Sequence, residues 1–440
     1  MLKQKTFKGG IHPGCHKELT RDKAIENAPV PQKLVIPLQQ GVGNKAKSLV
    51  KSGDIVRMGQ LIGDADGFIS AKAHSPVSGK VLSVSKQLNP VYGKCDSVVV
   101  ENDGQDTPFA DYAPVTGVSG MSAAEMLEAV KDAGIVGLGG AAFPTHVKLS
   151  PPKNKTVDTV ILNAAECEPY LNCDNRLMIE NAGEVIKWLE VIARILGVKN
   201  VYIGIEDNKP GALKSLEKGL GADSGAGVQI SVEVLPAKYP QGAEKQIINA
   251  ITGRIVPAGG LPMDVGCVVQ NAGTAFAVYE AVYMGKPLME RVVTITGSCV
   301  KKPGNYRVRI GTVLSDLKDT FGGFSEDPKK FVSGGPMMGI AQYSMDIPVT
   351  KSTSGALFLT EKEAVSYKEG VCIRCGKCIE ACPMQLVPTA LMLRVKKAKY
   401  GEAKEMGIAN CYECGSCAFV CPARIPLLDY MKYGKAMMPK

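Results

Sequence analysis

The sequence has no long hydrophobic run, which argues against a chain that spans a membrane by itself. The most apolar stretch, residues 265–284, is interrupted by Gln270, Asn271 and Glu280, whereas a transmembrane helix needs about 20 predominantly apolar residues. The first ten residues carry positive charge but have neither an apolar core nor a small-residue cleavage site. We therefore expect no secretory signal and a cytosolic address.

Basic runs broken by aromatic residues are also absent. The chain has 52 Lys and Arg against 43 Asp and Glu, a formal net charge of +9, and aromatic residues make up 6% of it. Because the cations are scattered, we do not expect a nucleic-acid partner. An anionic protein or a membrane surface stays open as a partner. The length of 440 residues and 45% hydrophobic content predict roughly three domains with ample cores.

What the sequence does have is cysteine in a repeated pattern. Two copies of one spacing lie 39 positions apart, Cys372-x2-Cys375-x2-Cys378-x3-Cys382-Pro383 and Cys411-x2-Cys414-x2-Cys417-x3-Cys421-Pro422. Three thiolates at i, i+3 and i+6 can hold one corner of a cubane cluster, and the fourth Cys of such paired runs ligates the other cluster.

We therefore predict two 4Fe-4S clusters that share the eight cysteines across the runs. The ligands are Cys372, Cys375, Cys378 and Cys421 for one cluster, and Cys411, Cys414, Cys417 and Cys382 for the other. Zinc sites or disulfides are the alternatives. Zinc sites rarely need four thiolates per run followed by proline, and disulfides would need an oxidising compartment.

Between the two cysteine runs, residues 387–405 are expected to form a basic helix that packs the clusters against each other. Its lysines, Lys396, Lys397, Lys399 and Lys404, are most simply a solvated face, with partner docking as the alternative.

Short β-rich runs punctuated by Gly-Asp and Ser-Gly over residues 50–84 predict a small barrel. This block resembles the biotinyl and lipoyl carrier domains, whose modified Lys lies upstream of a Pro-Val-Ser-Gly turn. In this sequence Phe68 stands where that Lys would be. The resemblance therefore implies a carrier-like scaffold without a swinging arm.

A glycine loop, Gly137-Leu-Gly-Gly-Ala-Ala-Phe-Pro-Thr145, follows a helix that the capping box Ser122–Glu125 opens and Gly134 can close. The loop matches G-x-G-x-x-A, but a Rossmann fingerprint should follow a strand and open a helix. Phosphate binding by the loop amides and a tight structural turn are both open.

Strands and helices then alternate, which predicts a largely parallel sheet with helices on its faces. The expected strands are 157–162 and 201–205, and the expected helices are 180–196 and 210–220. At the carboxyl end of the first strand, the loop from Asn163 to Pro169 carries Glu166 and Glu168, where a ligand should lie. Two solvated loop carboxylates are the alternative.

Residues 294–321 read as a small strand-rich module, followed by a turn at 334–339. A polar connection at 350–354 is expected to lead to the helical cluster domain from Glu361 onward.

Several of these motifs, in this order, resemble the flavin- and NADH-binding subunit of respiratory complex I. They are the glycine loop with Phe143-Pro-Thr, Lys148, the Asn-x-x-Glu-x-Glu-Pro loop, Tyr239-Pro-Gln-Gly-Ala-Glu244 and Val269-Gln-Asn271-Ala-Gly-Thr274. The resemblance implies an FMN site made by Gly137, Gly139, Gly140, Lys148, Asn163, Glu166, Asn271 and Thr274. It implies that Phe143, Glu168 and Glu244, with Tyr239 in the same stretch, line a site for NAD(H). Leu138 and Ala165 depart from the family pattern, so those two contacts are not carried over.

Nearly the whole chain is similar to the RnfC family of the Rnf complex, which has a carrier-like front, a complex-I-like middle and a two-cluster tail. The opening Thr6-Phe-Lys-Gly-Gly-Ile-His-Pro13 supports this. The resemblance implies a peripheral subunit at the cytoplasmic face of a membrane-bound assembly that moves electrons between ferredoxin and NAD while pumping sodium ions or protons. The other Rnf subunits, including a ferredoxin-like iron–sulfur subunit, would be its partners.

The expected fold class is therefore multidomain α/β with four parts. They are a barrel-sandwich scaffold (1–115), an FMN- and NAD(H)-binding α/β domain (116–290), a β-grasp-like SLBB module (291–345), and a linker with a helical ferredoxin-like domain (346–440). No catalytic acid or base is expected, because flavin converts hydride transfer into single-electron steps. The alternatives are a soluble NADH-dependent cobalamin reductase of a microcompartment, and an electron-wire or assembly subunit without nucleotide activity.

Overall fold

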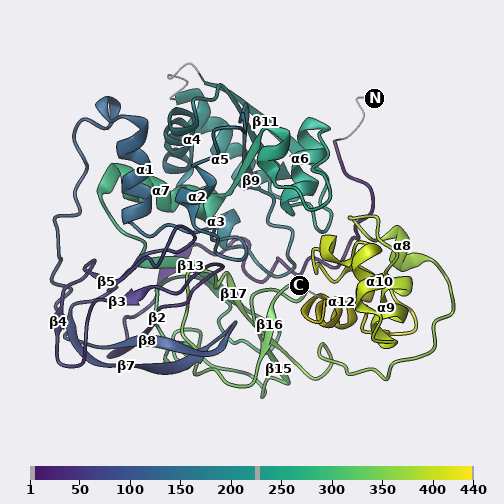
Figure 1. Ribbon diagram of the computed structural model, residues 1–440. Helices are drawn as coiled ribbons and strands as arrows, with labels where there is room; N and C mark the ends of the chain where they lie inside the picture. The colour runs from purple at the N-terminus through teal and green to yellow at the C-terminus, as the bar shows by residue number, and fades with distance from the viewer. Residues whose placement is uncertain (1–4, 223–227, 439–440) are drawn as a thin grey trace.

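The computed structural model (Figure 1) describes residues 5–222 and 228–438. An α/β domain lies at the top of this view, with the barrel at lower left and the helical C-terminal domain at right. A mixed sheet lies between the barrel and the helical domain. None of the helices in the described ranges is long and apolar enough to cross a membrane.

The N-terminal barrel consists of two small sheets. One has the strand order β2-β8-β7-β4 and the other β3-β5-β6. Their bounds are β2 Lys33–Pro37, β3 Lys47–Ser48, β4 Ile55–Val56, β5 Leu61–Asp64, β6 Ala73–His74, β7 Gly79–Asn89 and β8 Gly93–Asn102. Leu34, Ile36 and Val98 are fully buried between the sheets, as the alternation of apolar and polar residues in strands requires.

Phe68 lies on an exposed loop of this barrel and is 65% exposed. Its carbonyl oxygen lies 3.3 Å from the His146 ring nitrogen, and the two rings meet edge to face with centroids 6.3 Å apart. The loop that carries the modified Lys in carrier domains therefore contacts the α/β domain here.

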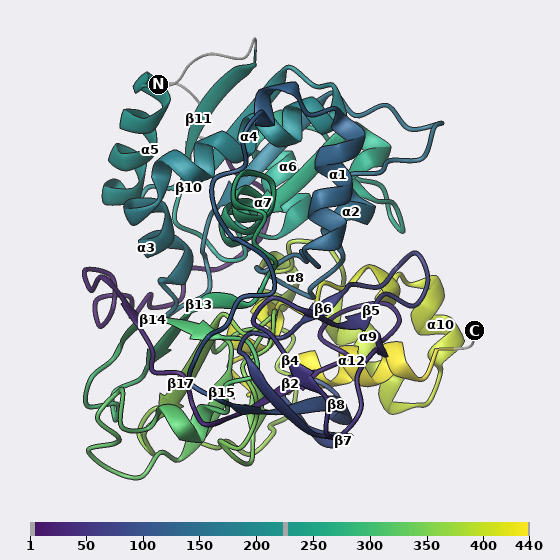
Figure 2. The ribbon, with the colours of Figure 1, turned by 90° about the vertical axis from the view of Figure 1, so that its left-hand side faces the viewer.

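The α/β domain contains the predicted parallel sheet, in the order β11-β10-β9-β12. The strands are β9 Thr159–Ala164, β10 Asn200–Glu206, β11 Gln229–Leu235 and β12 Cys267–Asn271. The helices are α1 Ala123–Asp132, α2 Thr145–Lys148, α3 Cys173–Glu180, α4 Ala182–Leu196, α5 Pro210–Ala222, α6 Glu244–Thr252 and α7 Ala272–Met284. Figure 2 shows these helices around the sheet.

Two local predictions in this domain have different outcomes. The capping box of α1 is confirmed, because Ser122 and Glu125 bond reciprocally, and Gly134 follows with φ 66°. The helix expected over 180–196 is corrected, because α3 was missed and α4 begins only after Asn181. Asn181 has φ −130° and ends one helix while starting the next.

The third sheet is mixed, with the order β1-β14-β13-β17-β15-β16. Its strands are β1 Ile25–Asn27, β13 Glu290–Thr296, β14 Gly304–Arg309, β15 Lys330–Ser333, β16 Ile340–Gln342 and β17 Gly355–Leu359. Two of these strands, β1 and β17, come from the ranges 1–115 and 346–440. The sheet therefore takes in chain from outside the range 291–345, because its central pairing needs β17 between β13 and β15.

Lys351 joins three parts of the molecule. Its buried ammonium donates to the carbonyl oxygens of Lys72 (2.6 Å) and Gly134 (2.8 Å). Burial lowers the pKa of this Lys to about 7. A single side chain from the segment before β17 thus satisfies carbonyls of both the barrel and the α/β domain.

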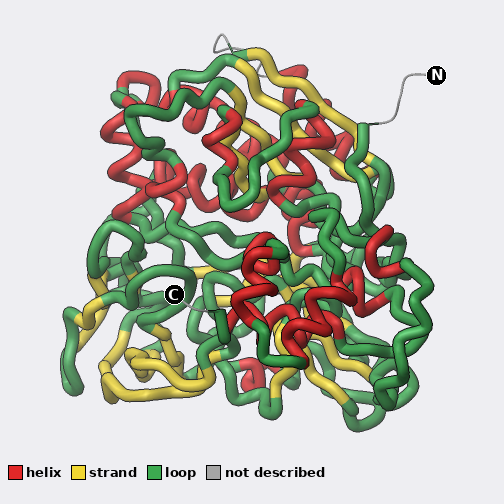
Figure 3. Tube along the Cα trace, turned by 45° about the vertical axis from the view of Figure 1, so that its right-hand side comes forward, coloured by secondary structure: helices red, strands yellow, loops and turns green. Residues whose placement is uncertain are grey.

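The C-terminal domain is helical (Figure 3), with α8 Lys377–Glu380, α9 Pro388–Lys396, α10 Tyr400–Glu405, α11 Ser416–Phe419 and α12 Leu427–Ala436. The single helix expected over 387–405 is wrong. It is two helices, α9 and α10, because Ala398 adopts φ 53° and turns the chain. Residues 365–376 have no regular structure, so no helix starts at Glu361.

An N-terminal strap connects the helical domain to the α/β domain. Gly10 N–H donates to the carbonyl oxygen of Ala381 (2.9 Å), and the next residue, Ile11, forms a two-way backbone bridge with Tyr239 (both 2.8 Å). Gly9 has φ 83°, and a Cβ there would lie 2.6 Å from the carbonyl oxygen of Cys382. The Gly-Gly pair therefore lets the strap lie directly against the backbone of the cluster domain.

We predict that Gly9→Ala loosens this strap. A left-handed backbone costs an L-residue about 1–2 kcal/mol, and the close contact with Cys382 adds to that cost. Cleavage of the native chain near residues 5–13 by a dilute protease should therefore accelerate by about 5- to 30-fold, following the same free-energy difference. Lys8→Ala, at an exposed neighbouring position, is the control and should leave the rate unchanged. Equal rates for all three chains would show that the strap does not depend on Gly9.

Candidate functional site

The carboxyl ends of β9 and β12 form the switch point of the parallel sheet. From β9 the chain adds β10 and β11 on one side and then β12 on the other. Asn163 of β9 and Asn271 of β12 are register partners at this end. In open α/β sheets, ligands bind at such a reversal of strand order, so both asparagines lie where a cofactor is expected.

Asn271 starts helix α7 and fixes its neighbours. Its Oδ1 accepts from Thr274 N–H (3.1 Å), and its Nδ2 donates to Asp174 Oδ2 (2.6 Å). On the other strand, Asn163 Nδ2 donates to the carbonyl oxygen of Gly242 (2.7 Å). The two asparagines therefore tie the strand ends to α3, α7 and the segment before α6.

The glycine loop lies over the start of α7. Thr274 Oγ1 accepts from Leu138 N–H (2.9 Å), and a Cβ on Gly139 would lie 2.7 Å from Asn271 Nδ2. Gly139 and Gly140 are exposed. The loop closes on itself, since Gly137 N–H donates to the Phe143 carbonyl oxygen (2.9 Å). Glycine is thus required where the loop meets Asn271, and the exposed glycine backbone next to a helix N-terminus is suited to an anion.

Glu166 is buried, so it is not a solvated loop residue. It accepts from the Cys173 thiol (3.3 Å), Asp174 N–H (3.0 Å) and Asn175 N–H (3.2 Å). A carboxylate at free helical N–H groups is favoured by hydrogen bonding and by the helix dipole. Glu166 therefore fixes α3 against the end of β9.

Two buried lysines hold the same loop from beneath. Lys17 Nζ donates to the carbonyl oxygens of Glu168 and Leu171, and Lys209 Nζ donates to that of Glu166 (3.2 Å) and to Glu206 Oε2 (2.7 Å). Burial lowers the pKa of Lys17. For Lys209 burial acts in the same direction, but Glu206 and Glu166 outweigh it and raise the pKa. Sequence patterns gave no sign of Lys17, because it lies about 150 residues before the loop.

Asp174 is a further residue that the sequence patterns missed. Burial first, and then the neighbouring Glu166, raise the pKa of Asp174 to about 6, while the hydrogen bond from Asn271 opposes the shift. A Cβ on Gly273 would lie 3.2 Å from its Oδ1. A titratable carboxyl group thus lies directly beside the start of α7.

Lys148 and Glu244 form an ion pair at the same edge, with Nζ and Oε1 2.5 Å apart. Lys148 also donates to the Val269 carbonyl oxygen (3.0 Å), and both side chains keep about 30% exposure. The structure therefore brings together the glycine loop, Lys148, Asn163, Asn271, Thr274 and Glu244. Phe143 lies half-buried in the loop itself.

Glu168 points to a different neighbour. Its Oε1 accepts from Met337 N–H (2.6 Å) and Met338 N–H (3.0 Å), and a Cβ on Gly335 would lie 2.1 Å from its Cγ. Burial raises the pKa of Glu168, against the effect of the two amides. Glu168 thus anchors the 334–339 turn to the sheet's carboxyl edge.

Tyr239 connects this edge to the cysteine runs. It is buried, and its hydroxyl donates to the carbonyl oxygen of Cys414 (2.8 Å). Burial raises its pKa far above the usual value. Gly242, three residues on, accepts from Asn163, so one short segment contacts both the switch point and a cysteine of the second run.

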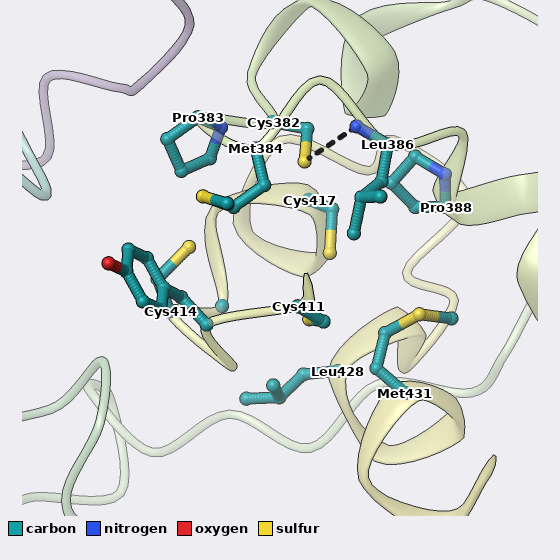
Figure 4. A pocket seen from close by; sticks show the side chains of 12 residues that line it. Cys382, Pro383, Met384, Leu386, Pro388, Cys411, Cys414, Cys417, Leu428 and Met431 are labelled. Atoms are coloured by element: carbon teal, nitrogen blue, oxygen red, sulfur yellow. Dashed lines mark hydrogen bonds between the residues drawn. The ribbon is translucent and has the colours of Figure 1, made fainter. Parts of the chain in front are cut away.

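Four cysteines from the two runs surround a single cavity (Figure 4): Cys382, Cys411, Cys414 and Cys417. Apolar side chains, including Leu386 and Met431, complete its wall. Burial raises the pKa of the Cys411 thiol to about 11 and of Cys417 to about 12, and the nearby thiols of the set add to the rise. Four buried thiols of this kind become thiolates only with compensating positive charge, which iron supplies.

The other four cysteines lie together at the far side of the domain. Burial raises the pKa of Cys378, and Cys421 and Cys375 are close enough to contribute. Cys372 packs on the same apolar cluster as Cys378 and Cys421. Within residues 5–222 and 228–438, no three His, Cys, Asp or Glu side chains converge as ligands of one metal ion. The thiols are instead spread around the walls of their sites, in the crossed grouping expected from the sequence.

Several buried polar atoms near the switch point have no hydrogen-bond partner in the part of the chain that the structure describes. They belong to Gln241 (both Oε1 and Nε2), Gln270 (Nε2) and Thr145 (Oγ1). Gln241 precedes Gly242, Gln270 precedes Asn271, and Thr145 ends the glycine loop. Because buried polar groups are nearly always satisfied in native proteins, these atoms fit a site that takes a polar ligand.

Family models match four consecutive parts of the chain. They are described as the RnfC barrel sandwich hybrid domain (residues 5–105), the Nuo51 FMN-binding domain (130–280), the SLBB domain (292–341) and the 4Fe-4S dicluster domain (364–422). Among curated proteins, the RnfC-type component of the proton-translocating ferredoxin:NAD(+) oxidoreductase complex of Clostridium ljungdahlii is 48% identical over 91% of this chain and 87% of its own length.

The chain belongs to the RnfC family. The corresponding component of the Na(+)-translocating ferredoxin:NAD(+) oxidoreductase complex of Acetobacterium woodii is 46% identical over 88% of this chain and 86% of its own length. That of the ion-translocating oxidoreductase complex of Rhodobacter capsulatus is 40% identical over 99% and 84%. These relatives are each one component of a multi-subunit complex.

A solved structure supports the fold at low sequence identity. A chain of the NAD+-reducing [NiFe]-hydrogenase in the H2-reduced state superposes with a TM-score of 0.51 at 17% identity, over 75% of this RnfC chain and 65% of its own. The expected fold class, with FMN-binding and dicluster 4Fe-4S domains, is confirmed. The matches do not support the cobalamin reductase or the bare electron wire.

We predict a pH effect from Asp174. Its folded pKa is raised above the unfolded value near 3.8, so burying this group favours the protonated form. Folding is therefore penalised increasingly as pH rises from about 4 through 6. Asp174→Asn keeps an acceptor for Asn271 and removes that penalty, so the variant should gain stability over wild type at pH 8 but not at pH 4.

Thermal unfolding, followed by the fluorescence of Trp188, the single tryptophan of the chain, measures this difference. Trp188 lies fully buried in the core of the same α/β domain. A constant gap between the two unfolding temperatures from pH 4 to pH 8 would contradict the raised pKa.

Proposed function

We propose that this RnfC chain is the electron-transfer subunit of a membrane-associated, ion-pumping ferredoxin:NAD oxidoreductase. It exchanges hydride between NAD(H) and FMN and passes single electrons through two 4Fe-4S clusters to partner subunits. The observation that carries this is the hydrogen bond from Tyr239 to Cys414. It joins the switch-point site of the α/β domain directly to a cysteine of the cluster domain.

In this proposal the FMN is held by Gly137, Gly139, Gly140, Lys148, Asn163, Glu166, Asn271 and Thr274. The glycine-loop amides and Lys148 meet the phosphate, since a cation and backbone N–H groups are the usual phosphate partners. Glu166 acts through α3, which it caps. FMN supplies the chemistry that links a two-electron hydride carrier to one-electron clusters.

The nucleotide is proposed to lie along Phe143, Glu168, Tyr239 and Glu244. Both amides of the 334–339 turn bond to Glu168 Oε1, so Oε2 is the oxygen proposed to accept from a ribose hydroxyl or the carboxamide. The half-buried Phe143 ring offers a face for stacking. These residues orient the nucleotide and exclude water, and none has to act as an acid or base.

The clusters are proposed on Cys372, Cys375, Cys378 and Cys421, and on Cys411, Cys414, Cys417 and Cys382. We place the domain limits at 1–115, 116–290, 291–345 and 346–440, with β1 and β17 lent to the third part. We also propose that the chain works at the cytoplasmic face of the membrane, bound to the other Rnf subunits. A ferredoxin-like iron–sulfur subunit would be among them.

Anaerobic titration of the iron-reconstituted, flavin-loaded chain with NADH tests this function. We expect the flavin absorbance to bleach, with electron paramagnetic resonance signals of reduced clusters appearing in step. Bleaching without cluster signals would separate the flavin from the iron. Full clusters with no bound flavin and no response to NADH would leave only an electron wire.

A single substitution tests the nucleotide site. Glu168→Gln keeps an oxygen for the amides of Met337 and Met338 but replaces Oε2 by a donor NH2 group, so the turn stays and the acceptor is lost. We expect the KM for NADH with ferricyanide as acceptor to rise about tenfold, as for loss of one charged hydrogen bond of about 1.5 kcal/mol. Flavin and iron content should not change. Unaltered kinetics would remove Glu168 from the site.

A further inference from the structure

We propose that the first cysteine run carries the docking surface through which a partner iron–sulfur protein exchanges electrons with this chain. The surface, here called the first-run face, consists of Val371, Ile373, Arg374, Cys375 and Gly376. The proposal rests on the function proposed above and deepens it, because it assigns an order to the two clusters. The second-run cluster is next to the flavin domain, and the first-run cluster is the exit.

The argument begins with an internal repeat of backbone conformation. Arg374 and Glu413, at the same place in the two runs, have φ of 57° and 59°, and the following glycines, Gly376 and Gly415, have φ of 80° and 77°. The two runs therefore fold alike, and each residue of one can be compared with its counterpart 39 positions away.

In the second run this face is covered by the rest of the molecule. Tyr412 Oη accepts from Lys245 N–H (3.1 Å), and the Cys414 carbonyl oxygen accepts from the Tyr239 hydroxyl (2.8 Å). A Cβ on Gly415 would lie 3.3 Å from the Met337 carbonyl oxygen. Tyrosine, amide and turn backbone thus close over the cysteine loop.

In the first run the same face is open. Ile373, the counterpart of Tyr412, is 67% exposed, and Val371 is 88% exposed. Cys375, the counterpart of the buried Cys414, is exposed. A Cβ on Gly376 would meet nothing within 4 Å. One cysteine loop is therefore packed against the flavin domain, and its equivalent faces solvent with apolar side chains beside a cluster ligand, as an interaction site does.

The open face is also preformed. Its chain enters along the outer side of the cluster domain (Figure 1) and is fixed just before Val371. There Gly370 N–H donates to the Ala423 carbonyl oxygen (2.8 Å), Lys396 pairs with Glu369 (2.6 Å), and Arg424 lies 4.2 Å from the centre of the Tyr367 ring. A partner therefore meets a fixed surface and has little ordering cost to overcome.

The chemistry of the face indicates what binds it. Where the second run has Glu413 and Ser416, the first has the exposed cations Arg374 and Lys377, with Glu380 as the acidic residue in the following turn. Glu413 is moreover paired with Lys435 (2.5 Å). Apolar side chains ringed by cations fit an acidic protein whose own cluster lies near its surface, and such charge complementarity sets encounter rate and orientation.

The test uses the whole complex purified from cells that express the variant chain. In Ile373→Glu/Arg374→Glu the apolar contact is lost and the charge is reversed. We expect NADH oxidation with ferricyanide to stay within twofold of wild type. NAD+ reduction by reduced ferredoxin should fall at least tenfold, or the chain should be lost from the complex on purification. Ile55→Glu, 70% exposed on the barrel strand β4, is the matched control and should behave as wild type.

The wild-type ferredoxin-dependent rate should also fall as salt is raised, because the charges are exposed. Val371→Glu is the second variant, and it should show the same loss if the double variant fails to retain iron. Full ferredoxin-dependent activity and normal assembly in a variant with intact iron would overturn the proposal. So would an isolated wild-type chain that is a dimer dissociated by Ile373→Glu, because the face would then bind a second copy. Failure of the wild-type NADH and ferricyanide reaction would instead refute the underlying function.

Discussion

The contact between Tyr239 and the Cys414 backbone is the interaction on which the electron-transfer arrangement depends. On one side, Tyr239 begins the segment whose Gly242 is tied to Asn163 at the switch point. On the other side, its hydroxyl reaches the second cysteine run. The N-terminal strap reinforces this contact, since Ile11 pairs with the Tyr239 backbone while Gly10 holds Ala381. Two parts of the molecule that are far apart in sequence are thereby fixed edge to edge.

Buried charge sets the shape of the flavin-domain edge. Glu166 and Asp174 lie beside the first turn of α3, and Lys17 and Lys209 satisfy the loop carbonyls from beneath. Buried ions are expensive unless they are paired and hydrogen-bonded, so this network is held in a single arrangement. It leaves the glycine loop, α7 and the Lys148–Glu244 pair as the part of the edge that faces a ligand.

The sequence predicted those features that depend on local pattern. The two cysteine runs, the capping box at Ser122 and the strand–helix alternation each follow from spacing along the chain. The features it missed need contacts between distant residues. Lys17 and Asp174 act on a loop through burial that no periodicity reveals, and the strands β1 and β17 join a sheet formed by another part of the chain. The break between α9 and α10 depends on the left-handed conformation of Ala398, a residue type that gives no sign of a turn.

The asymmetry of two similar cysteine loops links the fold to the direction of electron flow. One loop is packed on the flavin domain and the other is open, so a single relay from flavin to surface passes the second-run cluster first. Rapid mixing of the anaerobic chain with NADH, with freezing at set times and electron paramagnetic resonance of each sample, tests this order. In a Cys417→Ala chain that has lost the second-run cluster, the flavin should still bleach while reduction of the first-run cluster slows by at least tenfold. Reduction of the first-run cluster at the wild-type rate in that chain would contradict the proposed route.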